Sequence, residues 1–332
     1  MNARAYCPPS RVILILIVTL GITTGCGQGQ ETEEAATATE IVVETEAPQE
    51  EFTPNPSPDI SPLSTPLGGA TSLAFTSDRD GNNEIYVTSP DGSELTQLTD
   101  GEAENYFPEF SPSGYQLLYW AFDETVSPPI VEFRILVADG SERVLGPGVG
   151  WSSWSPDGNE VVIVNISSND SQDILRIDST GNPTWLTDNP ADDREPDWSP
   201  DGTTIAFASY RDGQAQIYLM NPDGSNQRRL SSLDMAEFEP DWSPDGEVIA
   251  FVSGDHSDTQ IYLVDADGSN LRQLTDSPGF NENPAWSPDG TLIAFWSDRT
   301  GNREIFVIGV DGTGLQQITD HPASDENPTW SP

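Results

Sequence analysis

Short stretches in which large and small apolar residues alternate recur along the chain, and residues typical of tight turns bound each stretch. Residues 204–209 read Thr-Ile-Ala-Phe-Ala-Ser, the alternation expected of a strand packed between two neighbouring sheets. Glycine follows aspartate in the flanking turns, where a positive φ is needed. This unit is predicted to contain four strands, at residues 195–199, 204–209, 216–220 and 227–231.

The same unit repeats with a fixed period of 44 residues. The anchor of the repeat is Trp-Ser-Pro-Asp-Gly, which begins at Trp154, Trp198, Trp242 and Trp286, with a variant at Phe110 and a truncated copy at Trp330. A fixed period in this range indicates units that bury one another's faces. Residues 69–332 hold six periods, so each period is predicted to be one blade of a β-propeller.

The two ends of the repeat region complement each other. Trp330 is followed by only two residues, so the sixth anchor has no further strands of its own. The missing strands are found at the other end, at residues 73–75, 84–87 and 95–99. The sequence therefore predicts an all-β, six-bladed propeller of four-stranded blades, closed by a clasp between the C-terminal strand and the N-terminal repeat.

The full repeat reads Pro-x-Trp-Ser-Pro-Asp-Gly, Ile-Ala-Phe-x-Ser-Asp-Arg-x-Gly, Glu-Ile-Tyr and Leu-Thr-Asp, and its clearest copies lie at residues 284–306 and 75–87. This pattern resembles the WD-like propeller repeat of the TolB family of bacterial periplasmic proteins. The resemblance covers residue 69 to the end and implies a propeller outside the cytoplasm. Similar repeats form the propellers of prolyl-oligopeptidase-like peptidases and oligogalacturonate lyases, so the motif specifies a fold rather than a function.

The segment before the repeats has two parts. An apolar run at residues 12–22 is too short to span a bilayer and leads into Thr23-Thr24-Gly25-Cys26, which predicts a lipoprotein-type signal peptide over residues 1–26 and lipidation of Cys26. Plain secretion with cleavage nearby is the alternative. Residues 27–68 are rich in Glu, Thr and Pro with no cation, and they predict a disordered tether.

Composition excludes several classes of function. The 13 basic residues are all arginine, against 55 acidic residues and a net charge of −42. Without lysine there is no P-loop, Schiff-base or Ser-x-x-Lys chemistry, and a chain this acidic repels nucleic acid. Two histidines and two cysteines cannot form a histidine-rich metal centre, a structural zinc site or a disulfide framework.

The residues just before each predicted innermost strand are the candidate binding site, because the repeat places them around the mouth of the central channel. A ring of carboxylates and aromatic side chains there would hold a cation or a basic peptide, or it would be ordinary solvated surface. The candidates are Tyr106, Phe107, Trp151, Asp193, Arg194, Glu195, Glu237, Phe238, Glu239, Glu282, Asn283, Asp325, Glu326 and Asn327.

Other conspicuous residues are predicted to be structural. The calcium-loop lookalike at residues 78–82 lacks the Asp-x-Asp-x-Asp-Gly spacing and is predicted to be a turn. The anchor tryptophans are predicted to pack between blades rather than to form a ligand platform. His256 and His321 fall in loops and are predicted to be solvated rather than to bind a metal.

Two functions fit these residues. The first is a non-enzymatic, extracytoplasmic protein- or peptide-binding module, expected to be monomeric and tethered to the envelope, because the sequence offers no Gly-x-Ser-x-Gly, no usable cysteine and no lysine. The alternative is a carbohydrate or lactone hydrolase or lyase that uses paired carboxylates or a divalent cation at the channel mouth. No cofactor is expected apart from that divalent cation.

Replacing Cys26 tests the anchor. If Cys26 carries the lipid, the Cys26→Ser variant should move from the membrane fraction to the soluble fraction, because residues 27–332 contain no other cysteine that could be lipidated. Fractionation followed by detection with an antibody measures this. A variant that still sediments with membranes contradicts the prediction.

Overall fold

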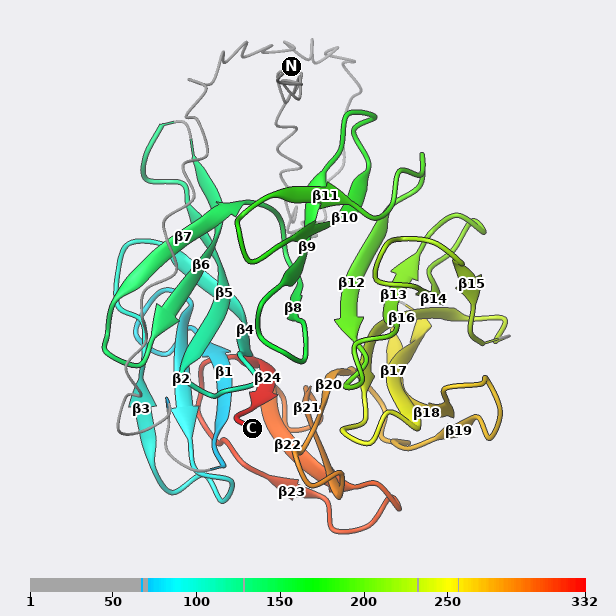
Figure 1. Cartoon of the computed structure of the whole chain (residues 1–332). Coiled ribbons are helices and arrows are strands. Elements are labelled where there is room, and N and C mark those ends of the chain that lie inside the picture. The colour runs from blue at the N-terminus through cyan, green and yellow to red at the C-terminus, as the bar shows by residue number, and fades with distance from the viewer. Residues whose placement is uncertain (1–66, 68–70, 128, 232, 256) are drawn as a thin grey trace, which may run out of the picture. The chain divides into compact units, whose positions relative to one another are not determined.

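The computed structural model describes residues 67, 71–127, 129–231, 233–255 and 257–332, and these residues form a ring of six four-stranded antiparallel blades (Figure 1). The predicted signal peptide, Cys26 and nearly all of the predicted tether lie outside the described residues. Among the described residues no helix is long and apolar enough to cross a membrane. The predicted fold class is confirmed.

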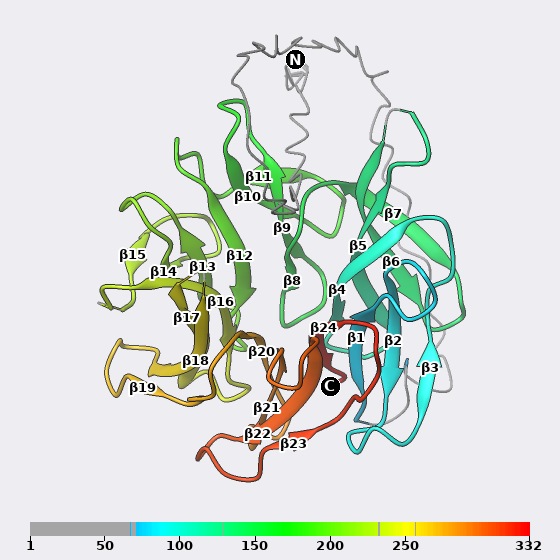
Figure 2. The ribbon, with the colours of Figure 1, turned by 180° about the vertical axis from the view of Figure 1, so that it is seen from behind.

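Each blade runs from an innermost strand beside the central channel to an outermost strand at the rim (Figures 1 and 2). The first blade contains β24 (Asp325–Trp330), β1 (Leu73–Ser77), β2 (Glu84–Thr88) and β3 (Leu95–Gln97). The second contains β4 (Glu104–Phe110), β5 (Gln116–Asp123), β6 (Ile130–Val137) and β7 (Glu142–Pro147). The third contains β8 (Ser152–Trp154), β9 (Val161–Ile166), β10 (Gln172–Ile177) and β11 (Pro183–Trp185).

The other three blades follow the repeat more closely. The fourth contains β12 (Asp193–Trp198), β13 (Ile205–Ser209), β14 (Gln216–Met220) and β15 (Arg228–Arg229). The fifth contains β16 (Ala236–Trp242), β17 (Val248–Asp255), β18 (Asp258–Asp265) and β19 (Arg272–Gln273). The sixth contains β20 (Asn281–Trp286), β21 (Leu292–Ser297), β22 (Glu304–Gly309) and β23 (Gln316–Gln317).

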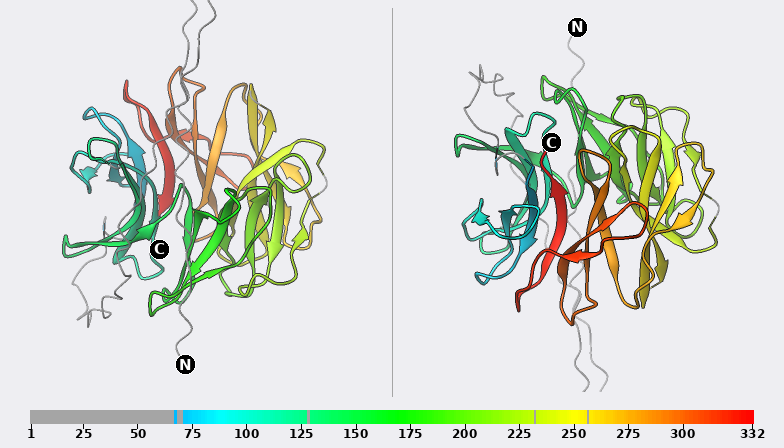
Figure 3. Two further views of the ribbon diagram at one scale, coloured as in Figure 1. Left: turned by 90° about the horizontal axis from the view of Figure 1, so that it is seen from above. Right: turned by 90° about the horizontal axis from the view of Figure 1, so that it is seen from below.

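The ring closes through a clasp, as the sequence predicts. β24, the last strand of the chain, pairs antiparallel with β1 and supplies the innermost strand of the first blade (Figure 3). The backbone N–H of Ser331 also donates to the carbonyl of Ser72 at 2.8 Å. β24 contacts the innermost strands on both sides, β20 and β4, so both termini of the repeat region are needed to complete the ring.

The apolar core is divided into clusters that each lie between two neighbouring blades. One cluster joins Ala206, Ile217 and Leu219 of the fourth blade to Trp242 and Phe251 of the fifth. Trp154, Trp198, Trp242 and Trp330 are each less than a tenth exposed. The prediction that the anchor tryptophans pack between blades is confirmed for these residues.

The Ser-Pro-Asp-Gly segments are tight turns, as predicted. In the fourth blade the N–H of Gly202, whose φ is 71°, donates to the carbonyl of Ser199 at 2.9 Å, and the hydroxyl of Ser199 donates to Asp201 Oδ1 at 2.7 Å. The hydroxyl of Ser199 and then the backbone N–H of Thr203 hold the pKa of Asp201 below its usual value. The calcium-loop lookalike is also a turn, closed by Gly81 N to Asp78 O at 3.0 Å.

Strand lengths differ from the prediction at both edges of a blade. The outermost strand of the fourth blade covers only Arg228–Arg229 rather than residues 227–231, because Asn226 before it has a φ of 58° and the strand is exposed. Apart from the short β8, the innermost strands are longer than predicted and begin at residues expected to precede them. β12, for example, begins at Asp193.

Removing the clasp tryptophan should destabilise the whole ring. Trp330 is 7% exposed, and its Nε1 donates to the carbonyl of Ala285 at 3.1 Å, so Trp330→Ala removes both packing and a bond to the sixth blade. We expect a loss of about 3–5 kcal/mol in the free energy of unfolding, measured by urea denaturation. Trp185 on β11 is 44% exposed, and Trp185→Ala serves as the control with a change within about 0.5 kcal/mol. Equal losses in the two variants would contradict the role of the clasp.

Candidate functional site

In five of the six blades a β-bulge in the innermost strand turns one side chain into the central channel. In five blades a residue other than glycine has a positive φ, between 51° and 56°, and a proline follows it. The pairing register with the next strand shifts at the same place, for example between Arg194 and Asp197. Proline has no N–H for the ladder, so the bulge is where it can be accommodated. The five residues are Phe107, Glu195, Glu239, Asn283 and Asn327.

The third blade reaches the same position by a different route. Gly150 has the positive φ, 76°, and Trp151 follows it just before the short strand β8. Trp151 and the five bulge residues all line one cavity of about 100 Å³ at the centre of the ring. We call these six residues the bulge ring: Phe107, Trp151, Glu195, Glu239, Asn283 and Asn327.

A second set of carboxylates lines the same cavity two residues further along the innermost strands. Glu109, Asp197 and Asp241 are these inner carboxylates. The sequence-based candidates did not include them, although the 44-residue period relates all three. The signal was present, because an acid follows the bulge proline in each of these strands.

Four of the channel carboxylates tie one blade to the next. Oε2 of Glu195 accepts the backbone N–H of Glu239 at 2.7 Å, and Oε2 of Glu239 accepts that of Asn283 at 2.7 Å. Asp197 and Asp241 likewise accept the N–H groups of Trp242 and Trp286, both at 2.7 Å. Each of these acids therefore has one oxygen bound to the next blade, and the other oxygen of Asp197 accepts the hydroxyl of Ser153 at 2.9 Å.

Burial raises the pKa of the channel carboxylates. The pKa of Glu195 rises to about 7 because desolvation outweighs the backbone hydrogen bond and the nearby Arg194. Desolvation raises the pKa of Asp197 to about 6. The pKa of Glu239 lies well above its usual value because of burial and then repulsion by Glu282 and Glu195, and burial with repulsion by Asp197 does the same for Asp241. Ionised, these groups repel one another inside a confined space.

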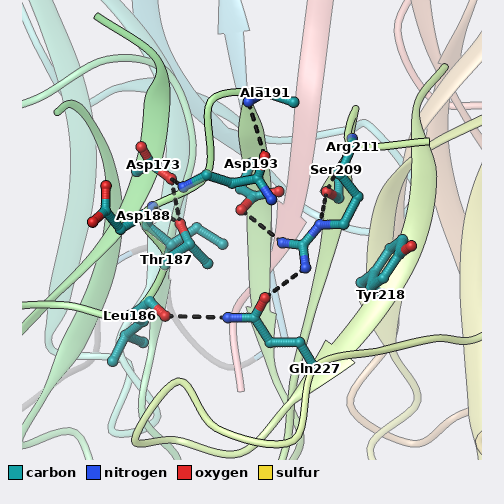
Figure 4. A network of polar contacts seen from close by, with 12 residues as sticks. Asp173, Leu186, Thr187, Asp188, Ala191, Asp193, Ser209, Arg211, Tyr218 and Gln227 are labelled. Carbon is teal, nitrogen blue, oxygen red and sulfur yellow. Dashed lines mark hydrogen bonds and ion pairs between the residues drawn. The ribbon is translucent and has the colours of Figure 1, made fainter. Parts of the chain in front are cut away.

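Three of the predicted site residues point away from the channel into their own blades. Asp193, Glu237 and Asp325 are 0% exposed. Asp193 pairs with Arg211 at 2.9 Å, and the guanidinium of Arg211 lies 4.7 Å from the ring centre of Tyr218 (Figure 4). The prediction that these three residues line the channel mouth is therefore wrong. In each of these blades the bulge residue two positions later faces the channel instead.

The pairing of a buried acid with an arginine recurs in the first blade, whereas the buried acid of the fifth blade has other partners. Asp325 pairs with Arg79 at 2.8 Å, with the guanidinium over the rings of Phe75 and Tyr86. Glu237 has no such arginine, and its Oε2 accepts the N–H of Ile217 at 3.1 Å. These acids stabilise the blades and are not available to a ligand.

The remaining predicted residues lie beside the bulge ring. Arg194 has its guanidinium 5.2 Å from the ring centre of Tyr210. Glu282 accepts the hydroxyl of Thr259 at 3.0 Å, and Glu326 pairs with Arg303 at 2.6 Å.

Two predicted aromatic residues also flank the bulge ring. Of the two histidines, only His321 lies within the described residues. Phe238 is partly buried against the core between the fourth and fifth blades, and the hydroxyl of Tyr106 accepts Nδ2 of Asn83 at 2.8 Å. His321 accepts the N–H of Ala323 on Nδ1 at 3.2 Å, whereas His256 lies outside the described residues. Within the described part of the chain, no group of three His, Cys, Asp or Glu residues is placed to hold a metal ion.

An aromatic cluster occupies one side of the channel mouth. The ring centres of Phe107 and Trp151 lie 4.7 Å apart, and Tyr106 lies 5.6 Å from Trp120. Trp120 also stacks on Phe122 at 6.0 Å. The sequence analysis missed Trp120 and Phe122, although the departure of residues 116–123 from the repeat was a usable signal. The aromatic cluster is Tyr106, Phe107, Trp120, Phe122 and Trp151, and all five side chains are partly exposed.

Comparison with known proteins agrees with this architecture. Residues 146–277 and 231–332 match the family model described as the TolB beta propeller domain, and together they cover more than half of the chain. The chain belongs to the TolB β-propeller domain family. The TolB-type propeller is 36% identical over 121 residues to an uncharacterized protein of Agrobacterium fabrum, and 33% identical over 112 residues to a TolB homolog of Chlorobaculum tepidum. Each match covers 33% of the chain, but only 39% and 25% of the relatives' own length.

Solved structures share the TolB-type propeller fold. TolB from Acinetobacter baumannii superposes with a TM-score of 0.72 at 21% identity, over 79% of this chain and 67% of that chain. A putative TolB from Agrobacterium tumefaciens gives 0.61 at 23% identity, over 77% and 91% of the two chains. An oligogalacturonate lyase from Vibrio parahaemolyticus gives 0.55 at 18% identity, over 78% and 76%. At these identities the likeness concerns the fold alone.

The raised pKa of Glu195 predicts a stability that falls with rising pH. Unfolded, this carboxyl ionises near pH 4.5, and folded near 7, so between these values the folded state holds a proton that the unfolded state has released. The free energy of unfolding should therefore fall across this window. In Glu195→Gln the part of this loss that comes from Glu195 is absent, so the variant should gain about 3 kcal/mol on the parent between pH 4 and pH 8.

Urea denaturation at both pH values measures that difference. Glu247, exposed in the turn at the other end of β16, provides the control, since Glu247→Gln should keep a constant difference from the parent within about 0.5 kcal/mol. A Glu195→Gln variant that tracks the parent at both pH values would show that this carboxyl ionises normally in the folded protein.

Proposed function

We propose that this TolB-type propeller is a non-enzymatic, extracytoplasmic module that binds a protein or peptide at the channel mouth, with Cys26 as its anchor to the envelope. The observation that carries the proposal is the division of the bulge ring. Its aromatic pair, Phe107 and Trp151, adjoins its acidic pair, Glu195 and Glu239, so apolar and negatively charged surface meet at one opening.

The aromatic cluster supports a protein or peptide ligand. Five partly exposed aromatic side chains from three strands or loops meet within ring-centre distances of 6.4 Å or less. Aromatic residues of this kind dominate the energetics of protein interfaces because they bury large areas with few rotatable bonds. Trp120 is held in place by its Nε1, which donates to the carbonyl of Gly148 at 2.9 Å, so the surface is preformed.

The charge of the propeller indicates a basic ligand. Residues 69–332 carry 46 acidic residues and 11 arginines. Most turn aspartates are tied to backbone N–H groups at the end of the blades opposite the bulge ring, as Asp201, Asp245 and Asp289 are. The acids that face the channel are therefore the part of this charge placed to select a ligand, and they favour a cationic peptide.

Peptide selection on the full chain tests the proposal. Peptides enriched from a random display library should combine basic with apolar residues, and their affinity should fall at least tenfold for the double variant Glu195→Gln/Glu239→Gln. Trp120→Ala should also weaken binding, because it removes the centre of the aromatic cluster. Fluorescence anisotropy of a labelled peptide measures both effects.

Glu247→Gln is the matched control, since it removes one carboxylate from the opposite face. Peptide affinity should be unchanged in this variant. If no peptide is enriched, or if the channel variants and the control bind equally well, the channel mouth is not the binding face.

A further inference from the structure

The interior of the channel is narrow, acidic and unmatched by any cationic side chain of its own. Five carboxylates line the cavity, and the described lining residues include no arginine, lysine or histidine. Glu195, Glu239 and Asp241 each have one oxygen bound to a backbone N–H of the next blade. Asp197 has one oxygen on such an N–H and the other on the hydroxyl of Ser153. Carboxylates that line one small cavity are stabilised by a positive charge placed among them.

The cavity is also lined by a neutral hydrogen-bond acceptor, Oδ1 of Asn327, and two hydrogen bonds determine how its amide is oriented. Nε1 of Trp296, which can only donate, donates to Oδ1 of Asn283 at 2.7 Å. Nδ2 of Asn327 donates to the same oxygen at 2.9 Å. The amide of Asn327 is thereby oriented with Oδ1 as its free atom.

This oxygen has no partner although it is buried. Asn327 is 8% exposed, lines the cavity, and has its Oδ1 unbonded within the described structure. A buried acceptor without a donor carries a desolvation cost that a bound donor removes. The free oxygen of Asn327 therefore points independently to a ligand that donates hydrogen bonds.

The size and walls of the cavity restrict that ligand to a slender group. A cavity of about 100 Å³ is smaller than the roughly 150 Å³ cavity that accommodates benzene in other proteins. Proline rings from the bulges line it between the bulge ring and the inner carboxylates, for example Pro196 and Pro240. Apolar walls around an acidic interior suit an aliphatic stem with a charged end.

The aromatic side of the ring favours a planar cation. Phe107 and Trp151 stand together on the wall beside Glu195, and guanidinium groups stack on aromatic rings while they donate to several acceptors at once. Nε1 of Trp151 is also buried without a partner in the described structure. A main-chain carbonyl of a peptide that carries the cation would accept a hydrogen bond from this N–H. A metal ion alone has no such acceptor.

We propose that a single arginine side chain of the bound peptide enters the channel, with its guanidinium among Glu195, Glu239 and Asn327 and its stem against the bulge prolines. This inference rests on the proposed function, which supplies the peptide. It adds the residue that the peptide must carry and the place where that residue is held.

Small arginine analogues test the channel separately from any whole peptide. N-acetyl-arginine methylamide should bind the full chain, and the citrulline analogue, which keeps the shape but loses the charge, should bind at least tenfold more weakly. The lysine analogue should be intermediate. Isothermal titration calorimetry at constant ionic strength measures the three affinities.

Variants locate the binding. Glu195→Gln/Glu239→Gln should weaken the arginine analogue at least tenfold, Asn327→Ala several-fold, and Glu247→Gln not at all. Circular dichroism and thermal melting of each variant confirm that the ring is folded. In a selected peptide, exchanging its arginine for citrulline should cost the same factor as in the analogue.

Several outcomes overturn the inference. They are equal binding of the arginine and citrulline analogues, unchanged binding in the double variant, and calcium chloride binding to the same carboxylates without competition from arginine. If selected peptides bind at the mouth but the arginine analogue does not, the inference fails and the proposed function stands. If the analogue binds but no peptide is ever selected, the proposed function fails and the channel remains a guanidinium site.

Discussion

The X-Pro bulge of the innermost strands is the constraint on which the centre of this propeller depends. A residue with a Cβ held at a φ near 55° costs about 1–2 kcal/mol, and five blades carry one. The cost recurs because the bulge has two consequences for the ring. It accommodates a proline that the ladder would otherwise reject, and it turns the preceding side chain into the channel, where Glu195 and Glu239 reach the backbone of the next blade.

The channel is therefore both a structural joint and a place of stored electrostatic repulsion. A hydrogen bond from a backbone N–H to a carboxylate is among the stronger ones in proteins, and four of them link consecutive blades around the channel. The same acids have raised pKa values because water is scarce and like charges are near. In the neighbouring blades neutral amides occupy the same position, and Asn283 accepts Nδ2 of Asn327 in the next blade without placing a charge in the channel. A cationic ligand would stabilise the ionised carboxylates of Glu195 and Glu239, whereas it would have no such effect on an amide.

The 44-residue repeat was sufficient to predict the fold from the sequence. The bulge prevented an accurate prediction of which residues face the channel. The 44-residue period alone led to six blades, and the missing strands after Trp330 led to the clasp, because both are properties of residue order. The period also located the right segments of the channel mouth. It could not decide whether Asp193 or Glu195 faces the channel, since a left-handed residue other than glycine leaves no mark in the sequence. Trp120 was missed for another reason, because it lies within a strand rather than in the loops on which the search was centred.

In a ring of repeated blades, the positions that differ from blade to blade are the ones that can carry a specific function. Core positions must match from blade to blade, since each cluster is shared by two neighbours, and the turn aspartates are fixed by the backbone bonds that they accept. The bulge ring is less constrained because its side chains line the channel, and only its two glutamates accept backbone N–H groups of the next blade. Around the ring it changes from aromatic to acidic to amide in successive pairs of blades, from Phe107 through Glu195 to Asn327. A six-fold scaffold with a three-part lining favours a ligand that is itself asymmetric, with an apolar side, a cationic end and hydrogen-bond donors, and an arginine side chain on a peptide has all three.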